Sequence, residues 1–336
     1  MTTIEWTDHT LNPLVGCTKT RAKGAKQSGC EHCYAARASK SGRLQQFPQY
    51  HGVVDREGNW TGQVNFVPEQ LEKLFRFRKP TRVFMPSMSD PFHPAVKDEW
   101  LDQIFAAIAL NPKAIVQMLT KRPARMRDYF RTAKNRIRIA AVDMGRSTSN
   151  TDQGVLAEIE SCQWDWPLPN LWLGVSVENQ QAADERIPLL LQTPAAVRFL
   201  SCEPLLEAVD ISGFLNSRNR SKSIVKSTFW TIIGGESGPG ARPFYLEWAR
   251  SLIQQCRDAE VPVFLKQIGS NPMHYQNSLV DKPGTPPWML VEYLGYQGRG
   301  MRDRKGGDIQ EWPEDMRVRE FPDFSCEVIS IERSEK

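Results

Sequence analysis

The sequence predicts an α/β fold, an open or partial (β/α) barrel with a C-terminal appendage. Two observations lead to this prediction. Short apolar runs recur along the chain and end in polar residues, and stretches with a helical apolar pattern follow several of them. Near-continuous apolar runs suit parallel strands that are buried on both faces. Strands that alternate with helices form right-handed crossover units, and six such units fit a partial (β/α)6 barrel of the TIM type better than a flat sheet.

Six apolar runs are predicted to be the strands. They are RVFMPSMSD (82–90), AIVQMLTK (114–121), LWLGVSVEN (171–179), VRFLSCEP (197–204), WTIIGGES (230–237) and VPVFLKQIG (261–269). Helices are predicted after the first, third and fifth runs, because apolar residues there recur on one side. Asp98 is expected to cap the first helix, and the other two are ADERIPLLLQ (183–192) and LEWARSLIQQCRDA (246–259).

Three stretches interrupt this alternation. Residues 131–170 are too long for one connection and are predicted to be an insertion, and residues 213–229 are predicted to be an exposed basic loop. From residue 270 the chain is rich in Gly, Pro and charged residues. We therefore expect a barrel domain, residues 1–269, that includes an N-terminal cysteine loop, and a C-terminal extension, residues 270–336, packed on the barrel.

Composition narrows the class of protein. Hydrophobic residues make up 40% and charged residues 24% of the 336 residues, as in globular proteins. No apolar run reaches the roughly 18 residues that cross a bilayer, and the N-terminus lacks the apolar segment of a signal peptide. We expect a cytoplasmic protein with no membrane partner, in which the seven cysteines stay reduced. The formal charge of +4 permits a nucleic-acid partner without requiring one.

Polar residues follow nearly every predicted strand. The active site of a parallel barrel forms at the C-terminal ends of its strands, so these residues are candidates for holding a polar ligand. Strand ends are also wet, and solvation alone would favour polar residues there. The candidates are Ser87, Ser89, Asp90, Lys121, Glu178, Asn179, Glu203, Gly234, Gly235 and Glu236.

Three cysteines precede all six strands, spaced as C-x12-C-x2-C at Cys17, Cys30 and Cys33. A structural zinc site wants four Cys or His ligands, and His9 and His32 are candidates for the fourth. Three thiolates alone suit a [4Fe–4S] cluster that leaves one iron open for an outside ligand. The loop between them is basic and would favour the thiolates. The other cysteines are expected to be structural: Cys162, Cys202, Cys256 and Cys326.

Two further classes of function are open at this point. Asp90 and His93, in SMSDPFHP, are of the types that bind metal in a barrel hydrolase, although a capped turn bracketed by prolines is the simpler explanation. A zinc-stapled module that binds nucleic acid without catalysis is the other class. The basic segments 19–26 and 217–226 could follow the phosphates of a nucleic acid, although solvated loops explain them at least as simply.

The motifs resemble those of the radical SAM superfamily. A cluster-binding cysteine loop before a partial (β/α)6 barrel is typical of that superfamily, whose usual C-x3-C-x2-C spacing is stretched in this chain. SMSDPFHPAV and LTKRPARMRD resemble successive segments of its spore-photoproduct-lyase-like branch. Over most of the chain the sequence resembles a phage-associated family, the Gp37/Gp68-type or DUF5131 proteins. That likeness is in IEWTDHTLNPLVGC, CEHCYA, LGVSVEN, RIPLLLQTPAAVRFLSCEPLL and GGESGPGARP.

The resemblance implies a function. Cys17, Cys30 and Cys33 would hold a [4Fe–4S] cluster, and S-adenosylmethionine would bind the open iron and yield a 5′-deoxyadenosyl radical. Ser87, Ser89 and Asp90 would contact this cofactor, and the other strand-end candidates would bind either it or the substrate. The lyase branch implies a DNA, RNA or nucleotide substrate. The implied protein partners are an electron donor such as a flavodoxin or ferredoxin and a so-called three-Cys-motif protein.

Overall fold

A computed structural model of the chain describes residues 4–215, 228–273 and 301–323. Two features named from the sequence lie outside these ranges, namely the basic segment 217–226 and Cys326. Within them, no helix is both long enough and apolar enough to cross a membrane.

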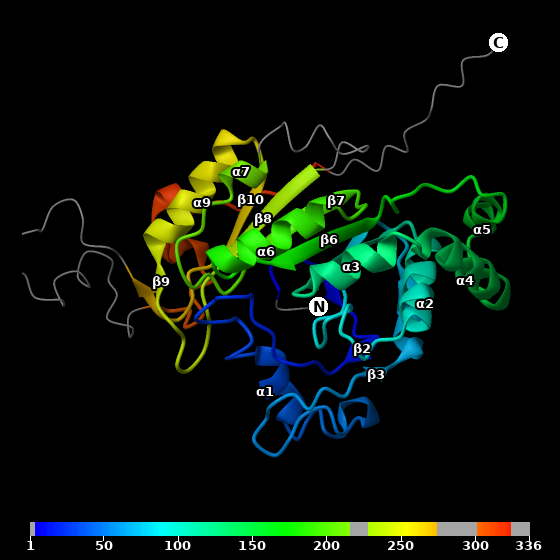
Figure 1. Cartoon of the computed structure of the whole chain (residues 1–336), viewed down its shortest axis with the longest axis horizontal. Helices are drawn as coiled ribbons and strands as arrows, with labels where there is room; N and C mark the ends of the chain where they lie inside the picture. The colour runs from blue at the N-terminus through cyan, green and yellow to red at the C-terminus, as the bar shows by residue number, and fades with distance from the viewer. Residues whose placement is uncertain (1–3, 216–227, 274–300, 324–336) are drawn as a thin grey trace, which may run out of the picture.

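Seven parallel strands form one strongly curled sheet, a half barrel, whose strands lie side by side in chain order (Figure 1). They are β1 (His9–Thr10), β4 (Thr81–Phe84), β5 (Ala114–Thr120), β6 (Leu171–Ser176), β7 (Val197–Cys202), β8 (Thr228–Gly234) and β10 (Val263–Gln267). The predicted α/β fold with a partial barrel is therefore confirmed, and the six apolar runs supply β4 to β8 and β10. Strand β1 pairs with β4 through only two residues, too few to leave an apolar pattern.

Helices connect the strands and cover the outer, convex face of the sheet (Figure 1). They are α2 (Asp98–Ala109), α3 (Pro123–Phe130), α6 (Gln180–Leu191), α7 (Ser212–Leu215) and α9 (Leu246–Asp258). The prediction that Asp98 caps α2 is wrong, because Lys97 occupies the N-cap position and no side chain caps the helix there. Asp98 is the first helical residue, and its carboxylate forms an ion pair with Arg125 at 3.2 Å.

The insertion at residues 131–170 is largely helical. It contains α4 (Ala133–Ser147) and α5 (Gln153–Glu160), and α4 packs along α2. Gly145 lets α5 approach α4 closely, because a Cβ atom there would lie 2.6 Å from a methyl carbon of Leu156. The insertion therefore forms a second helical layer outside the barrel, on the side of β4 and β5.

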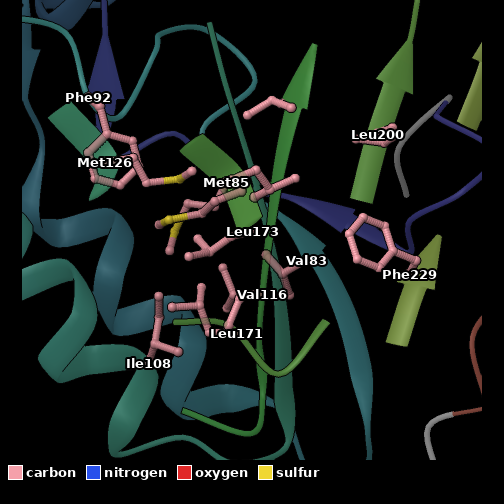
Figure 2. Packing of buried hydrophobic residues seen from close by; sticks show 14 of the residues in the cluster. Val83, Met85, Phe92, Ile108, Val116, Met126, Leu171, Leu173, Leu200 and Phe229 are labelled. Atoms are coloured by element: carbon pink, nitrogen blue, oxygen red, sulfur yellow. The ribbon is translucent and has the colours of Figure 1, made fainter. Parts of the chain in front are cut away.

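Apolar side chains fill both faces of the sheet, as expected for alternate residues of parallel strands. On the convex face, Val83, Val116 and Leu173 pack together with Ile108 of α2, as Figure 2 shows. The concave face carries an aromatic cluster in which Trp6 contacts Phe84 edge to face, with ring centroids 4.8 Å apart. Trp172, Phe199, Trp230 and Phe264 complete it. This cluster fills the barrel interior, and we call it the aromatic floor.

A C-terminal segment, residues 301–323, runs along the edge strand β10. The amide of Leu265 donates to the carbonyl of Val318 at 3.0 Å, and the amide of Glu320 donates to the carbonyl of Val263 at 2.9 Å. The segment also contains two short 3-10 helices, Ile309–Glu311 and Glu314–Met316. Trp312 anchors it, because its ring is 2% exposed and its Nε1–H donates to the carbonyl of Gly306. An edge strand with unpaired backbone groups is thereby covered.

We predict that Trp312→Ala lowers the free energy of unfolding by about 3–5 kcal/mol, the usual cost of removing a buried aromatic ring. Chemical denaturation measures this change. Trp164→Ala is the matched control, because that ring is only half-buried, and it should cost about 1 kcal/mol. Equal losses in the two variants would show that the C-terminal segment does not stabilise the sheet edge.

Candidate functional site

The three cysteines lie around one pocket at the C-terminal mouth of the half barrel. Cys17 follows β2 (Leu14–Val15), which pairs with β3 (Asn65–Phe66), and Cys30 and Cys33 come just before α1 (Tyr34–Lys40). All three line a pocket with about 650 Å³ of empty volume that opens to solvent. Four of the strand-end candidates line the same pocket: Ser87, Ser89, Asp90 and Lys121.

The backbone before Cys17 is held between two neighbours. The amide of Gly16 donates to the carbonyl of Met88 at 3.0 Å, and Oγ of Ser89 donates to the carbonyl of Gly16 at 2.6 Å. Gly16 has a φ of +105°, and a Cβ atom there would lie 2.1 Å from the carbonyl oxygen of Gln63. No larger residue fits this position. Ser89, predicted as a cofactor contact, thus fixes the position of Cys17.

Arg122 connects the end of β5 to the cysteine loop. Its guanidinium donates to Oδ2 of Asp90 at 2.8 Å and to Oγ1 of Thr18 at 2.8 Å. One of its N–H groups also points at Sγ of Cys17, 3.7 Å away. A guanidinium beside a sulfur favours the thiolate form.

The Cys17 thiol is nevertheless protonated at neutral pH. Its pKa is raised to about 12 in all: burial is the largest cause, the charges of Asp90 and Cys30 act in the same direction, and Arg122 opposes them. A metal ligand must be a thiolate, so metal binding at this pocket would release a proton from Cys17. The positive charge that then stabilises the anion, Arg122, is already in place.

Both carboxylate oxygens of Asp90 are used by the protein. Oδ1 accepts from the amide of Phe92 at 2.9 Å and from Oγ1 of Thr120 at 2.7 Å. Oδ2 accepts from the amide of Lys121 at 3.0 Å as well as from Arg122. Asp90 therefore positions the residues that end β5.

His93 is similarly engaged. Its Nδ1 accepts from the amide of Ala95 at 3.1 Å, so the proton lies on Nε2, which donates to Oγ1 of Thr18 at 2.9 Å. Burial, followed by the charge of Arg122, lowers the pKa of His93 to about 4, and the ring is neutral at neutral pH. Asp90 and His93 both satisfy protein groups, which does not favour a hydrolase that uses them as metal ligands.

Two residues at the end of β6 hold the second half of the cysteine loop. Glu178 forms an ion pair with Arg186 at 2.7 Å, with both side chains 1% exposed, and its other oxygen accepts from the amide of Gly29 at 3.4 Å. Burial alone would raise the pKa of Glu178, but the charges of Lys121 and Arg186 hold it below its usual value. Asn179 caps α6 and donates to the carbonyl of Gln27 at 3.0 Å.

Glu236, at the end of β8, holds the same loop from the other side. Its carboxylate binds Arg242 at 2.6 Å and Nδ1 of His32 at 2.9 Å. Arg242 also donates to the carbonyl of Ser28 at 3.0 Å. Burial opposes this arrangement, but the hydrogen bonds and charge of Arg242 hold the pKa of Glu236 below its usual value. His32 is thus turned toward β8 and is not part of the pocket wall. His9, in β1, packs on the ring of Phe77.

Of the remaining candidates, Ser87 and Lys121 line the pocket, and Glu203, Gly234 and Gly235 lie elsewhere on the mouth. Ser87 contacts Asn12 and accepts the Tyr34 hydroxyl on its carbonyl at 2.7 Å, and Lys121 donates to Oγ of Ser176 at 2.8 Å. Glu203 pairs with Lys266. Gly234 and Gly235 both pack closely against other residues. A Cβ atom on Gly234 would lie 3.1 Å from Cγ of Glu203, and one on Gly235 would lie 2.7 Å from the carbonyl oxygen of Ile268.

The three thiols surround the pocket without meeting at one point. Among the residues that the structure describes, no three His, Cys, Asp or Glu side chains are grouped so that they could hold a metal ion. A single zinc ion needs its ligands on one centre. A [4Fe–4S] cluster binds each cysteine at a different iron, which suits thiols that are spread around a pocket.

A family model matches residues 1–305 of the chain, and its description is protein of unknown function (DUF5131). The chain belongs to the DUF5131 family. No curated protein and no solved structure matches the chain.

Three arginines in this DUF5131 protein had no predicted role, although they organise the site. Arg122, Arg186 and Arg242 each pair with a strand-end acid, and Arg122 and Arg242 also bind the cysteine loop directly. Their positions in the sequence indicate this role only weakly. Arg122 directly follows the candidate Lys121, and Arg242 ends the glycine-rich segment GGESGPGAR, which contains the candidate Glu236. Their partners in the loop are too distant in sequence to reveal the contacts.

We predict that Glu178→Gln lowers the free energy of unfolding by about 3–5 kcal/mol, because it leaves Arg186 charged and buried without its counter-ion. It should also increase hydrogen exchange at Gly29, because Gln has a single acceptor oxygen, which Arg186 takes, and its NH2 group then faces the Gly29 amide. Glu160→Gln is the control, because it breaks an exposed pair with Arg146 and should cost less than about 1 kcal/mol. Unchanged exchange at Gly29 would mean that Glu178 does not hold the cysteine loop.

Proposed function

We propose that this protein is a radical SAM enzyme, in which Cys17, Cys30 and Cys33 hold a [4Fe–4S] cluster and S-adenosylmethionine binds beside it. One observation supports this above the others. The three thiols line a single pocket at the C-terminal mouth of a parallel half barrel, where barrel enzymes hold their ligands. When bound, such a cluster supplies the electron that cleaves S-adenosylmethionine to methionine and 5′-deoxyadenosine, with hydrogen abstraction from a substrate.

The protein residues would prepare this pocket. Arg122 is positioned by Asp90 and would stabilise the Cys17 thiolate when the proton leaves. Lys121 extends into the pocket and has donors beyond the one given to Ser176, so it would bind an anionic or carbonyl group of the cofactor or substrate. The aromatic floor would keep water from entering through the opposite end of the barrel.

We predict that Cys17→Ala, Cys30→Ala and Cys33→Ala each abolish cluster binding, because three ligands leave no spare thiol. Iron and sulfide analysis after anaerobic reconstitution should give about four of each per chain in the native protein. Cys162→Ala is the matched control, since that cysteine is exposed just after the insertion helix α5, and it should keep the full cluster.

Two results would contradict this assignment. One zinc and no iron in the native protein would favour a structural metal site instead. Loss of iron in His32→Ala, as complete as in the cysteine variants, would show that a fourth protein ligand fills the open iron. Catalysis is checked separately: reduced, loaded protein should release 5′-deoxyadenosine from S-adenosylmethionine, and failure to do so would rule out this chemistry.

We also propose a nucleic-acid or nucleotide substrate. The support within the described residues is the exposed basic segment 19–26 beside the pocket. Part of its charge is compensated by the protein, since Arg21 forms an ion pair with Glu31 at 2.7 Å and Lys19 donates to Asn59 at 3.0 Å. Lys23 and Lys26 are also exposed, and phosphates would compete for all four side chains.

We predict that DNA or RNA binding weakens steeply with salt, because bound counter-ions are released. Replacing Lys19, Arg21, Lys23 and Lys26 together by Gln should flatten the slope of log K against log salt by about one for each phosphate group that is no longer bound. Iron content should not change. Fluorescence anisotropy with labelled single-stranded and double-stranded oligonucleotides measures the slope. Absence of binding at about 50 mM salt would contradict a nucleic-acid substrate.

A further inference from the structure

Two oppositely charged side chains meet at the ends of β7 and β10. Nζ of Lys266 lies 3.2 Å from Oε2 of Glu203, and the two side chains are 19% and 16% exposed. Glu178 and Glu236 bind the backbone or side chains of the cysteine loop, whereas Glu203 and Lys266 bind each other. This pair has no role in the pocket described above.

One oxygen of this pair lacks a donor. Oε1 of Glu203 is buried and accepts no hydrogen bond from the residues that the structure describes. A carboxylate can accept several hydrogen bonds, and a buried acceptor left unpaired costs free energy. A bound ligand with an N–H or O–H group would remove that cost.

Both side chains lie on the inner face of the half barrel. A Cβ atom on Gly234 would lie 3.1 Å from Cγ of Glu203, so the absence of a side chain at Gly234 makes room for the carboxylate. Gly234 follows Trp230 of the aromatic floor and Ile232, which packs in the same cluster, at two-residue intervals and therefore shares their face. The pairing of β10 with β8 skips Lys266, an irregularity that re-aims a side chain.

The pair is close to the cysteine pocket. A Cβ atom on Gly29 would lie 3.0 Å from Cδ of Pro204 and 3.8 Å from Cε of Lys121, so Gly29 separates the residue after Glu203 from a side chain of the pocket wall. A ligand on the pair would lie beside the cluster site.

We propose that Glu203 and Lys266 bind the substrate by a neutral amide-type edge, an N–H donor beside a carbonyl acceptor. This inference rests on the radical SAM function proposed above, for which it names the substrate chemistry. Oε1 of Glu203 accepts the N–H, and Nζ of Lys266, which has donors beyond the one given to Glu203, donates to the carbonyl. Such an edge occurs in the lactam of a nucleobase and in a carboxamide.

A neutral ligand fits better than a charged one. The positive charge of Lys266 is already compensated by Glu203, so an anion would gain little there and would be repelled by the carboxylate. An alkylammonium brings three donors to one open acceptor and would leave N–H groups unpaired in a largely buried site. One donor and one acceptor leave the pair neutral and satisfied.

The test is ligand-observed NMR on the full chain with four probes at millimolar concentration: uridine, 3-methyluridine, N-acetylglutamine amide and propylammonium. We expect uridine to bind, and we expect 3-methyluridine, whose N–H is blocked, to bind more weakly by a factor of about ten or more. If N-acetylglutamine amide binds more tightly than uridine, the amide-type edge of the substrate is a carboxamide rather than a nucleobase. Propylammonium should not compete.

Three variants locate the binding. Glu203→Gln and Lys266→Met should each weaken binding of the preferred probe about tenfold, and Gly234→Ala should weaken it by displacing Glu203 while keeping both charges. Glu158→Gln and Lys113→Met are controls at exposed positions on α5 and before β5. Thermal unfolding shows which variants are folded, and Lys266→Met suffices if Glu203→Gln is not.

Several outcomes would overturn the proposal. They are no binding by any probe, equal binding of uridine and 3-methyluridine, preference for propylammonium, and binding that the folded variants leave unchanged. Running the measurements with and without the iron–sulfur cluster separates this inference from the proposed function. Cluster loading and 5′-deoxyadenosine release can succeed while amide-edge binding fails, and binding can be seen in protein that carries no iron.

Discussion

Asp90 and Arg122 form an ion pair at 2.8 Å inside the barrel mouth, with side chains 9% and 13% exposed. Asp90 belongs to the turn after β4, and Arg122 follows β5, so the pair links neighbouring strand ends. Because Asp90 also binds the backbone and hydroxyl groups that end β5, the guanidinium is held in one orientation, toward Thr18 and Cys17. Without Arg122, the partly buried Cys17 would lose the cation that lies 3.7 Å from its sulfur and that would stabilise its anion.

Ion pairs between a strand-end acid and an arginine recur around the mouth. The cysteine loop gains little from its own apolar side chains, so it depends on bonds from other parts of the chain. Acids at the ends of β6 and β8 each pair with an arginine, and these groups bind the loop backbone at Gly29 and Ser28. Buried pairs of this kind add little net stability, but each accepts one geometry, and together they keep three thiols around one pocket.

The apolar runs predicted β4 to β8 and β10 because both faces of these strands are buried, so nearly every residue in them is apolar. They did not predict β1, which has two residues, or the helices α4 and α5, whose exposed sides are polar. The cysteines were found from their spacing, since neighbours in sequence are neighbours in the loop. A strand-end position does not reveal what a side chain faces, and so Glu178, Asn179 and Glu236 were grouped with Lys121 although they bind the loop.

The distances along the chain between the loop and its anchors impose an order on assembly. The contact of Arg122 with Thr18 spans 104 residues, and that of Arg242 with Ser28 spans 214. A ribosome therefore releases the cysteines long before the residues that position them, and domains fold as their parts emerge. The thiols would remain solvent-exposed during most of synthesis, and the finished pocket would form only after β8 had joined the sheet. Insertion of the proposed iron–sulfur cluster would thus be a late step that follows translation.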